Sequence, residues 1–228
     1  MDQQQHQVIL LHGMGRSPRS MLKIERALIK QSYRVLNAGY SAITGNFEEI
    51  LNQLLDKIKP WVNKGSPVHF IGHSFGGILI RGILAQGFGW NYGRCVMLGS
   101  PNQGTSVASY MTSHKLLKHF TPKVAQELIP ESELLDRLPE PEIETGIIAG
   151  NKKYNPVIPV TWFYKVATGD APGDGVVELS NTQCRTMADF IVLPLHHSFM
   201  MWDSQLIKQI IHFLENGNFV HSEVASAK

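Results

Sequence analysis

The sequence predicts an α/β fold, built on a mostly parallel sheet of about six strands with helices on both faces. Short apolar, often β-branched runs alternate with longer segments of helical periodicity. The apolar runs do not alternate with polar residues, which indicates strands that are covered on both sides. The chain has 228 residues and is 43% hydrophobic, so we expect one domain, residues 1–228, with a sizeable core.

Six segments have the character of buried strands, and helical segments lie between most of them. The expected strands are residues 7–11, 33–39, 68–72, 94–100, 145–150 and 189–195. Ser17 and Pro18 supply an N-cap and a first-turn proline for a helix that extends to about residue 29. Further helices are expected at residues 46–58, 75–86 and 203–215.

Residues 104–144 do not fit this alternation. The segment is helical in pattern but is broken by four prolines, so we expect a small insertion of short helices over one edge of the sheet. Two interpretations stay open, ordinary packing helices and a cap over a site. In the second, the apolar pocket would be lined by Tyr110, Met111, Leu116, Leu117 and Phe120.

Composition and charge exclude several classes of protein. Charged residues make up 18% of the chain, the formal net charge is +2, and no block of like charges occurs. We therefore expect no nucleic-acid partner and no electrostatic binding to an anionic membrane. The longest apolar stretches are interrupted, as by Arg81, so no transmembrane segment is predicted. The oligomeric state is not indicated by any of these features.

The N-terminal residues and the two cysteines bear on the compartment in which the protein is expected. The N-terminal residues lack the basic and long apolar regions of a signal peptide, so a cytoplasmic location is expected, although a processed secreted form would look the same. Cys95 and Cys184 are too few for a disulfide framework, and Cys95 lies in an apolar run typical of a buried core.

The segment "VHFIGHSFGG" places a serine, Ser74, between an expected strand and an expected helix. Gly72 and Gly76 flank it, and small neighbours are required where a strand turns this sharply into a helix. Such a turn exposes the hydroxyl, and the N-terminus of the following helix favours developing negative charge. Ser74 is therefore the candidate nucleophile. A rival, Ser106, has no preceding strand and is better explained as part of a helix start.

A serine hydroxyl needs a base to accept its proton, and a histidine is the expected one. The loop after the last strand offers His196 and His197, of which we favour His197 because it lies further from the strand. His73 adjoins Ser74, but consecutive side chains diverge, and His69 lies within a strand. His196 stays open as the alternative.

The base in turn needs a carboxylate that orients its ring, placed in the chain between the serine and the histidine. Asp174 in "GDGVV" is preferred, because its turn leads into apolar residues that can anchor it. Asp170 and Asp189 remain alternatives.

Two backbone N–H groups are expected to form an oxyanion hole, those of Met14 and Phe75. Met14 lies in "LLHGMGR" directly after the first strand, and Phe75 follows the nucleophile. His12 is more simply explained as a structural loop residue. The candidate substrate-binding residues are His12, Phe199, Met200, Tyr110 and Met111.

Together these segments resemble α/β-hydrolases of the small bacterial lipase and esterase type, in particular the group described as GPI inositol-deacylase-like. The likeness is carried by "VILLHGMGRSPRSM", "VHFIGHSFGGILIR", "VMLGSPNQGT", "GDGVV" and "LHHSFMMWDSQLIKQIIHFLENGNF". It implies an α/β-hydrolase fold and a catalytic triad of Ser74, Asp174 and His197. The chain departs from the pattern in the long approach to Asp174, "NKKYNPVIPVTWFYKVATGDAP".

These residues and the resemblance together predict a serine hydrolase that cleaves carboxylic esters through an acyl-enzyme and needs no metal or organic cofactor. The substrate would be a small-molecule or lipid ester, because apolar side chains surround the expected site. A thioesterase, acyltransferase or amidase would use the same residues. A non-catalytic ligand receptor on the same scaffold is the alternative from another class.

Overall fold

The sheet is the frame of the molecule, and its six strands are all parallel. The computed structural model describes residues 5–119, 121–154 and 160–221. The strands are β1 (Gln7–Leu11), β2 (Arg34–Ala38), β3 (Val68–His73), β4 (Tyr92–Leu98), β5 (Thr145–Gly150) and β6 (Asp189–Leu193). Their order across the sheet is β2-β1-β3-β4-β5-β6. The predicted α/β fold and its six strands are confirmed.

The helices connect these strands and form the outer layers. The α-helices are α1 (Leu22–Lys30), α2 (Phe47–Ile58), α3 (Phe75–Ala85), α4 (Ser106–Ser113), α5 (Lys115–Lys118), α6 (Glu133–Arg137), α7 (Val160–Thr168) and α8 (Ser204–Asn216). Short 3₁₀ helices are η1 (Pro18–Met21), η2 (Lys123–Leu128), η3 (Ser180–Thr182) and η4 (Met200–Trp202). Among the described residues, no helix combines the length and apolar character needed to cross a membrane.

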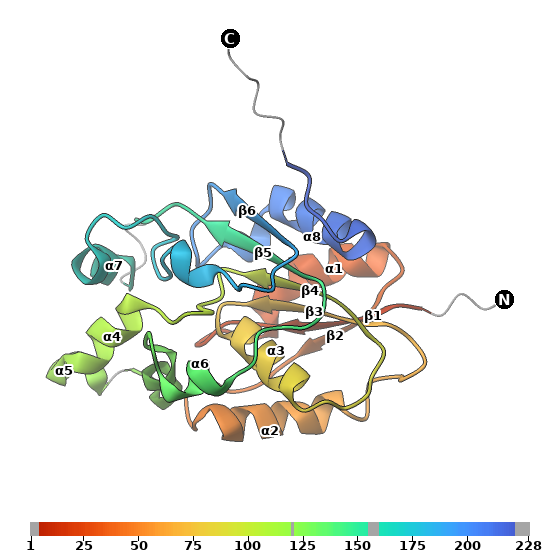
Figure 1. The fold of residues 1–228 in the computed structure, drawn as a ribbon, viewed down its shortest axis with the longest axis horizontal. Helices are drawn as coiled ribbons and strands as arrows, with labels where there is room; N and C mark the ends of the chain where they lie inside the picture. The colour runs from red at the N-terminus through yellow and green to blue at the C-terminus, as the bar shows by residue number, and fades with distance from the viewer. Residues whose placement is uncertain (1–4, 120, 155–159, 222–228) are drawn as a thin grey trace, which may run out of the picture.

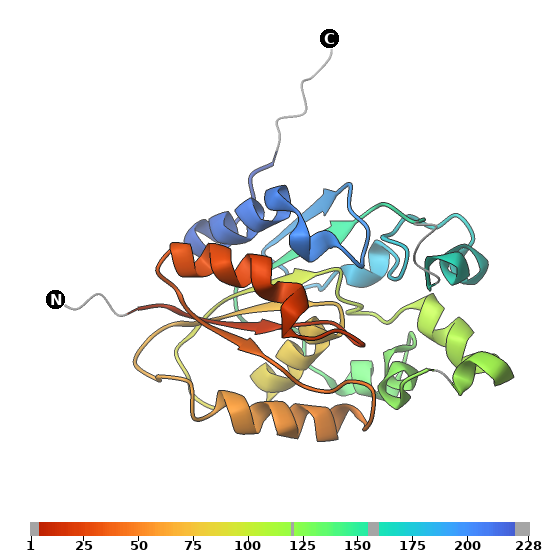
Figure 2. The same ribbon diagram turned by 180° about the vertical axis from the view of Figure 1, so that it is seen from behind.

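Helices α1 and α8 cover one face of the sheet, and α2 and α3 cover the other (Figures 1 and 2). Alternate strand residues serve the two layers: in β1, Ile9 and Leu11 pack toward α2 and α3, whereas Val8 and Leu10 pack toward α1 and α8. This double coverage is the reason that the strands read as continuous apolar runs.

Local chemistry explains where the covering helices begin. In α2 the Asn46 side chain accepts from the Glu49 amide and the Glu49 carboxylate accepts from the Asn46 amide, a capping box. Helix α8 begins after Asp203, whose carboxylate accepts from two amides of the first turn. The first helix differs from the prediction: it begins as the 3₁₀ turn η1, and the Ser17 side chain makes no capping hydrogen bond.

The order of the strands places a topological switch point between β1 and β3. The chain leaves β1 through α1 toward β2 on one side, and leaves β3 through α3 toward β4 on the other. At such a switch point the two connections diverge at the carboxyl ends of neighbouring strands, which is where open parallel sheets bind ligands. The loop after Leu11 and the residue after His73 therefore lie side by side.

Candidate active site

Ser74 lies at the turn between β3 and α3 in a backbone conformation that residues with a side chain rarely adopt. Its φ is 53° and its ψ is −121°, and it serves as the N-cap position of α3. Its amide donates to the Leu98 carbonyl at the end of β4 at 2.9 Å, which fixes the turn to the neighbouring strand. The strain is held by the packed strand and helix on either side, and such strain clusters at functional sites.

The glycines around Ser74 are required by the closeness of strand and helix. A Cβ on Gly72 would lie 2.6 Å from backbone atoms of Gly76 and Gly77. A Cβ on Gly76 would lie 2.4 Å from the Leu11 carbonyl oxygen of β1. These backbones could move apart only if α3 lost its packing against β1 and β3, so the predicted reason for these glycines holds in the structure.

His197 reaches Ser74 from a segment more than a hundred residues away. Its Nε2 lies 2.9 Å from Ser74 Oγ, and its Nδ1 lies 2.7 Å from Asp174 Oδ2. Because a carboxylate only accepts hydrogen bonds, Nδ1–H donates to Asp174 and Nε2 is left to accept the Ser74 hydroxyl proton. His196, the alternative, points elsewhere: its Nδ1 donates to the Lys152 carbonyl at 2.7 Å.

Asp174 is buried and held by its own turn. Its Oδ1 accepts the amides of Val176 and Val177 at 3.0 and 2.9 Å, which leaves Oδ2 for the imidazole. Its carbonyl accepts the His197 amide at 3.0 Å, so the two residues are joined through both main chain and side chain.

The two alternative acids lie away from Ser74. Asp170 is exposed, and Asp189 binds the Phe190 and Phe219 amides and His221 at the amino end of β6, whereas Ser74 follows the carboxyl end of β3. Of the three candidates, only Asp174 contacts His197 in the described part of the chain.

The loop after β1 lies next to Ser74, as the strand order requires. Gly13 and Met14 line the same cavity as Ser74. Among the described residues, neither the Met14 amide nor the Phe75 amide donates to another protein group. Phe75 is the first residue of α3, where backbone N–H groups have no partner within the helix. Both predicted oxyanion donors are therefore free, and the helix end adds a favourable dipole.

Two buried histidines, His12 and His73, make no side-chain hydrogen bond to Ser74. His12 stacks on Tyr40 with ring centroids 4.2 Å apart, and the Tyr40 hydroxyl donates to its carbonyl. Burial lowers the pKa of His12 and lowers that of His73 well below its ordinary value, which favours the neutral form of both rings. His73 Nε2–H donates to the His197 carbonyl at 2.9 Å and supports the loop that carries the base.

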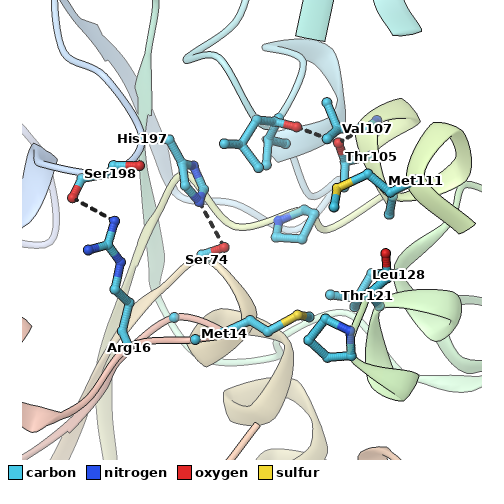
Figure 3. Close-up of a pocket in the computed structure, with 18 of the residues that line it drawn as sticks. Met14, Arg16, Ser74, Thr105, Val107, Met111, Thr121, Leu128, His197 and Ser198 are labelled. Carbon is cyan, nitrogen blue, oxygen red and sulfur yellow. Dashed lines mark hydrogen bonds between the residues drawn. The ribbon is translucent and has the colours of Figure 1, made fainter. Parts of the chain in front are cut away.

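Ser74 opens into an apolar cavity of about 310 Å³ (Figure 3). Helix α4 contributes Val107, Ala108 and Met111, and the following stretch contributes Thr121, Pro122, Ala125 and Leu128. The predicted insertion therefore supplies much of the wall, and the side chain of Met111 lies beside this space (Figure 3).

Four of the five candidate substrate-binding residues lie outside this cavity. His12 is buried behind the loop, and Tyr110 packs against His114 and Phe163. Met200 is fully buried in the core beside α8, and Phe199 lines a separate hollow. Met111 alone among the five lines the cavity in the described residues.

The other pocket residues expected in the insertion are Leu116, Leu117 and Phe120. Leu116 is 76% exposed and Leu117 is half-buried, and neither lines the cavity, whereas Phe120 lies outside the described residues. Ser106 is the first residue of α4 behind the N-cap Thr105, as expected for the rival serine.

Sequence reasoning missed Gly99 and Arg16. Gly99 follows β4 with φ 53°, and a Cβ there would lie 2.7 Å from Asp174 Oδ2 and 3.2 Å from His197 Nδ1. Arg16 lines the mouth of the cavity. The sequence places Gly99 at the end of an apolar strand, but only the strand order shows that this strand neighbours the one that precedes Ser74.

In the part of the chain that is described, no group of three or more His, Cys, Asp or Glu could hold a metal ion.

Comparisons with known proteins agree with this architecture. Residues 7–136, more than half of the chain, match the profile of the family described as palmitoyl protein thioesterase. The mature lipase BlEst2 of Bacillus licheniformis superposes with a TM-score of 0.72 at 16% identity, over 93% of each chain. The Staphylococcus hyicus lipase gives 0.66 at 13% identity, over 92% of this chain and 96% of that one. No curated protein matches the chain significantly by sequence.

A third solved structure gives the same result. The esterase EaEST of Exiguobacterium antarcticum superposes with a TM-score of 0.62 at 14% identity, over 92% of each chain. At these identities the likeness establishes the α/β-hydrolase fold, which the sequence resemblance implied.

Proposed function

Since the chain belongs to the palmitoyl protein thioesterase family of α/β-hydrolases, we propose that it is a serine hydrolase that cleaves carboxylic esters through an acyl-enzyme on Ser74. The main support for the proposal is the hydrogen-bonded series Ser74–His197–Asp174 beside an apolar cavity. His197 Nε2 lies 2.9 Å from Ser74 Oγ, and His197 Nδ1 lies 2.7 Å from Asp174 Oδ2. A nucleophile, a base and an orienting carboxylate in this arrangement are what acyl transfer requires.

The first half of the reaction forms the acyl-enzyme. Ser74 Oγ attacks the ester carbonyl while His197 Nε2 takes the hydroxyl proton, and Asp174 stabilises the imidazolium. The Met14 and Phe75 amides donate to the oxyanion, where pre-aimed donors contribute about 3 kcal/mol each. His197 then passes the proton to the leaving oxygen as the carbon–oxygen bond breaks.

The second half releases the acid. Water gives a proton to His197 as its oxygen attacks the acyl carbon, and the carbon–Ser74 bond breaks as the proton returns to Oγ. No metal or organic cofactor takes part in these steps. The cavity holds the acyl portion, so a small-molecule or lipid ester with an apolar acyl group is the expected substrate.

Thioester hydrolysis is the second candidate, and the family match favours it. A thioester presents the same carbonyl to the same nucleophile and departs as a thiol. Paired oxygen and thiol esters of one acyl group, assayed for kcat/KM, separate the two activities.

We also propose that residues 104–144 act as a cap within the single domain 1–228. Its support is the cavity wall, to which α4 and η2 both contribute. On this view the cap sets which acyl groups fit, and the sheet supplies the chemistry.

A fluorophosphonate probe tests the proposal directly, because it modifies only a serine that is activated for attack. We expect labelling of wild-type protein, none of Ser74→Ala, and strong loss in His197→Ala. A panel of p-nitrophenyl esters of different chain lengths should then be hydrolysed above the Ser74→Ala background. An unreactive Ser74 in folded protein, with no ester turned over, would favour the non-catalytic receptor instead.

A further inference from the structure

Arg16 lies at the mouth of the cavity, on the same loop as the proposed oxyanion donor Met14. Its Nη2 donates to the Ser198 carbonyl at 3.4 Å, a long hydrogen bond to the residue after the proposed base (Figure 3). The Arg16 amide donates to the Gly13 carbonyl at 3.2 Å, which closes the loop and sets where the side chain starts.

The guanidinium of Arg16 has few hydrogen-bond partners among the described residues. In the described residues it has no ion pair with any carboxylate, and the bond to Ser198 uses one of its five N–H donors. Arginine at a ligand site commonly binds carboxylate or phosphate with two parallel hydrogen bonds. Asp174, the acid of the proposed triad, is buried and is already hydrogen-bonded to His197 and to its own turn.

The position of Arg16 relative to Ser74 indicates which part of a substrate it would meet. Figure 3 shows Arg16 and Ser198 on one side of Ser74, and Met111, Thr121 and Leu128 on the other. The apolar side suits the acyl group. The leaving group must depart where His197 Nε2 can protonate it, which is the side that carries Ser198 and Arg16.

Positive charge continues beyond Arg16 along the same stretch of chain. Arg19 and Lys23 follow in η1 and α1, and Lys23 Nζ donates to the Trp202 carbonyl of η4 at 2.5 Å. The acid of this stretch, Glu25, accepts a hydrogen bond from Asn37 at 2.7 Å. Two further cations, Arg19 and Lys23, therefore follow Arg16 on this stretch of chain.

We propose that Arg16 binds an anionic group, a carboxylate or a phosphate, on the leaving alcohol or thiol of the substrate. This inference rests on the proposed function. The substrate class is an apolar acyl group joined to a negatively charged leaving group, held with its acyl part under α4 and its anion against the guanidinium.

Matched thioesters test the inference. The octanoyl thioesters of 3-mercaptopropionate and 3-mercaptopropionamide have the same size and differ in charge, and octanoyl-4′-phosphopantetheine against octanoyl-pantetheine adds the phosphate arm. For wild type we expect kcat/KM to favour the anionic member by about tenfold, mainly through KM, the effect of one hydrogen bond to a charged group. In Arg16→Gln the ratio should fall to about one, and Arg16→Lys should keep part of it.

Lys64→Gln is the charge control, because Lys64 is exposed and precedes the amino end of β3, whereas Ser74 follows its carboxyl end. It should leave the ratio unchanged in each pair. An unchanged preference in Arg16→Gln, or no preference in wild type while the neutral thioesters are hydrolysed, would overturn the inference and leave the proposed function intact. No hydrolysis of any of the four thioesters, with no fluorophosphonate labelling of Ser74, would instead overturn the proposed function. A preference in the phosphate pair alone would identify phosphate as the anion.

Discussion

The sheet-borne half of the site and the insertion-borne half are built differently. Ser74, His197 and Asp174 stand at the ends of buried strands or in tight turns, each held by main-chain hydrogen bonds and close backbone contacts. The insertion is a series of short helices, α4, α5, η2 and α6, of at most eight residues each.

This difference suggests a division of tasks. The chemistry needs atoms placed within fractions of an ångström, which the packed sheet provides. The cavity wall needs only apolar side chains of suitable volume, and short helices can change these without disturbing the strands. We expect substitutions in the sheet to abolish activity and substitutions in the insertion to change selectivity.

The largest effect is expected at the nucleophile. Ser74→Ala should lower kcat by about 10⁶-fold, the loss seen when a triad serine is removed. Hydrolysis of a p-nitrophenyl ester measures it. Ser106→Ala, in the insertion, is the matched control and should leave kcat within about twofold, since its hydroxyl contacts no proposed catalytic group. Equal losses in the two variants would contradict the assignment of Ser74.

The next-largest loss of activity is expected at Asp174, the acid proposed to orient His197. Asp174→Asn keeps the shape of the turn but favours the wrong ring tautomer of His197, so kcat should fall by about 10⁴-fold. Asp170→Asn, a few residues earlier and exposed, is its control. His197→Gln against His196→Gln makes the corresponding comparison for the base. Retained activity in Asp174→Asn would return Asp170 to consideration.

A substitution at Arg81, where the sheet-borne half meets the insertion, should lower the stability of the protein. Arg81 of α3 is buried, and its guanidinium donates to the carbonyls of Asn102, Leu135, Leu138 and Pro139. Arg81→Met would leave these carbonyls unpaired, and the free energy of unfolding should fall by about 3 kcal/mol or more in urea denaturation.

A surface arginine provides the control for that variant. Arg137 pairs with Glu48 at 2.6 Å, and both side chains are half exposed. Arg137→Met should cost less than about 1 kcal/mol. If the two variants were equally stable, the insertion would not depend on Arg81 for its attachment.

Low pH should destabilise the folded protein through the buried side chain of His69. Burial, with smaller contributions from His6 and Arg94, lowers the pKa of His69 to about 4. In the unfolded chain a histidine has a pKa of about 6.5, so the unfolded state binds more protons between these values and stability falls as the pH falls through that window. At pH 5 His69 should account for a loss of about 2 kcal/mol relative to pH 8.

Urea denaturation at several pH values measures this loss. His69→Gln should flatten the acid limb of the stability profile. His119→Gln, at an exposed position of the insertion, is the control and should not change it. An acid limb that is the same in both variants would show that His69 does not contribute.

The smallest effect concerns the cavity wall. Met111→Trp fills part of the space above Ser74, so kcat/KM for a decanoyl ester should fall by about tenfold relative to a butyryl ester, as for a pocket that loses room for a few methylenes. Leu116→Trp is the control, because that side chain points to solvent. A uniform loss over all chain lengths would place Met111 in the chemistry instead.

Much of this arrangement could be predicted because it depends on local patterns. The strand that precedes Ser74 is apolar throughout, and the glycines beside the serine reflect contacts within one strand–turn–helix unit. His197 could be preferred over His196 from its place in a loop. The choice of Asp174 depended on two valines after it, and these valines do form the turn that holds its carboxylate.

Substrate-binding residues were harder to predict, for a physical reason. An apolar side chain has the same sequence signal whether it faces a core or a cavity, and Met200 belongs to the core while Met111 faces the cavity. Gly99 gained its meaning from Asp174 and His197, which approach it from distant segments.

The sequence by itself determined the strands, the helices and the sharp turn at Ser74, because periodicity, capping and glycine placement act over a few residues. The tertiary structure alone decided which strands are neighbours, and therefore that the loop bearing Arg16 and Met14 faces Ser74 and His197. Contacts between segments a hundred or more residues apart depend on how both faces of the sheet are covered, and no local pattern records that choice.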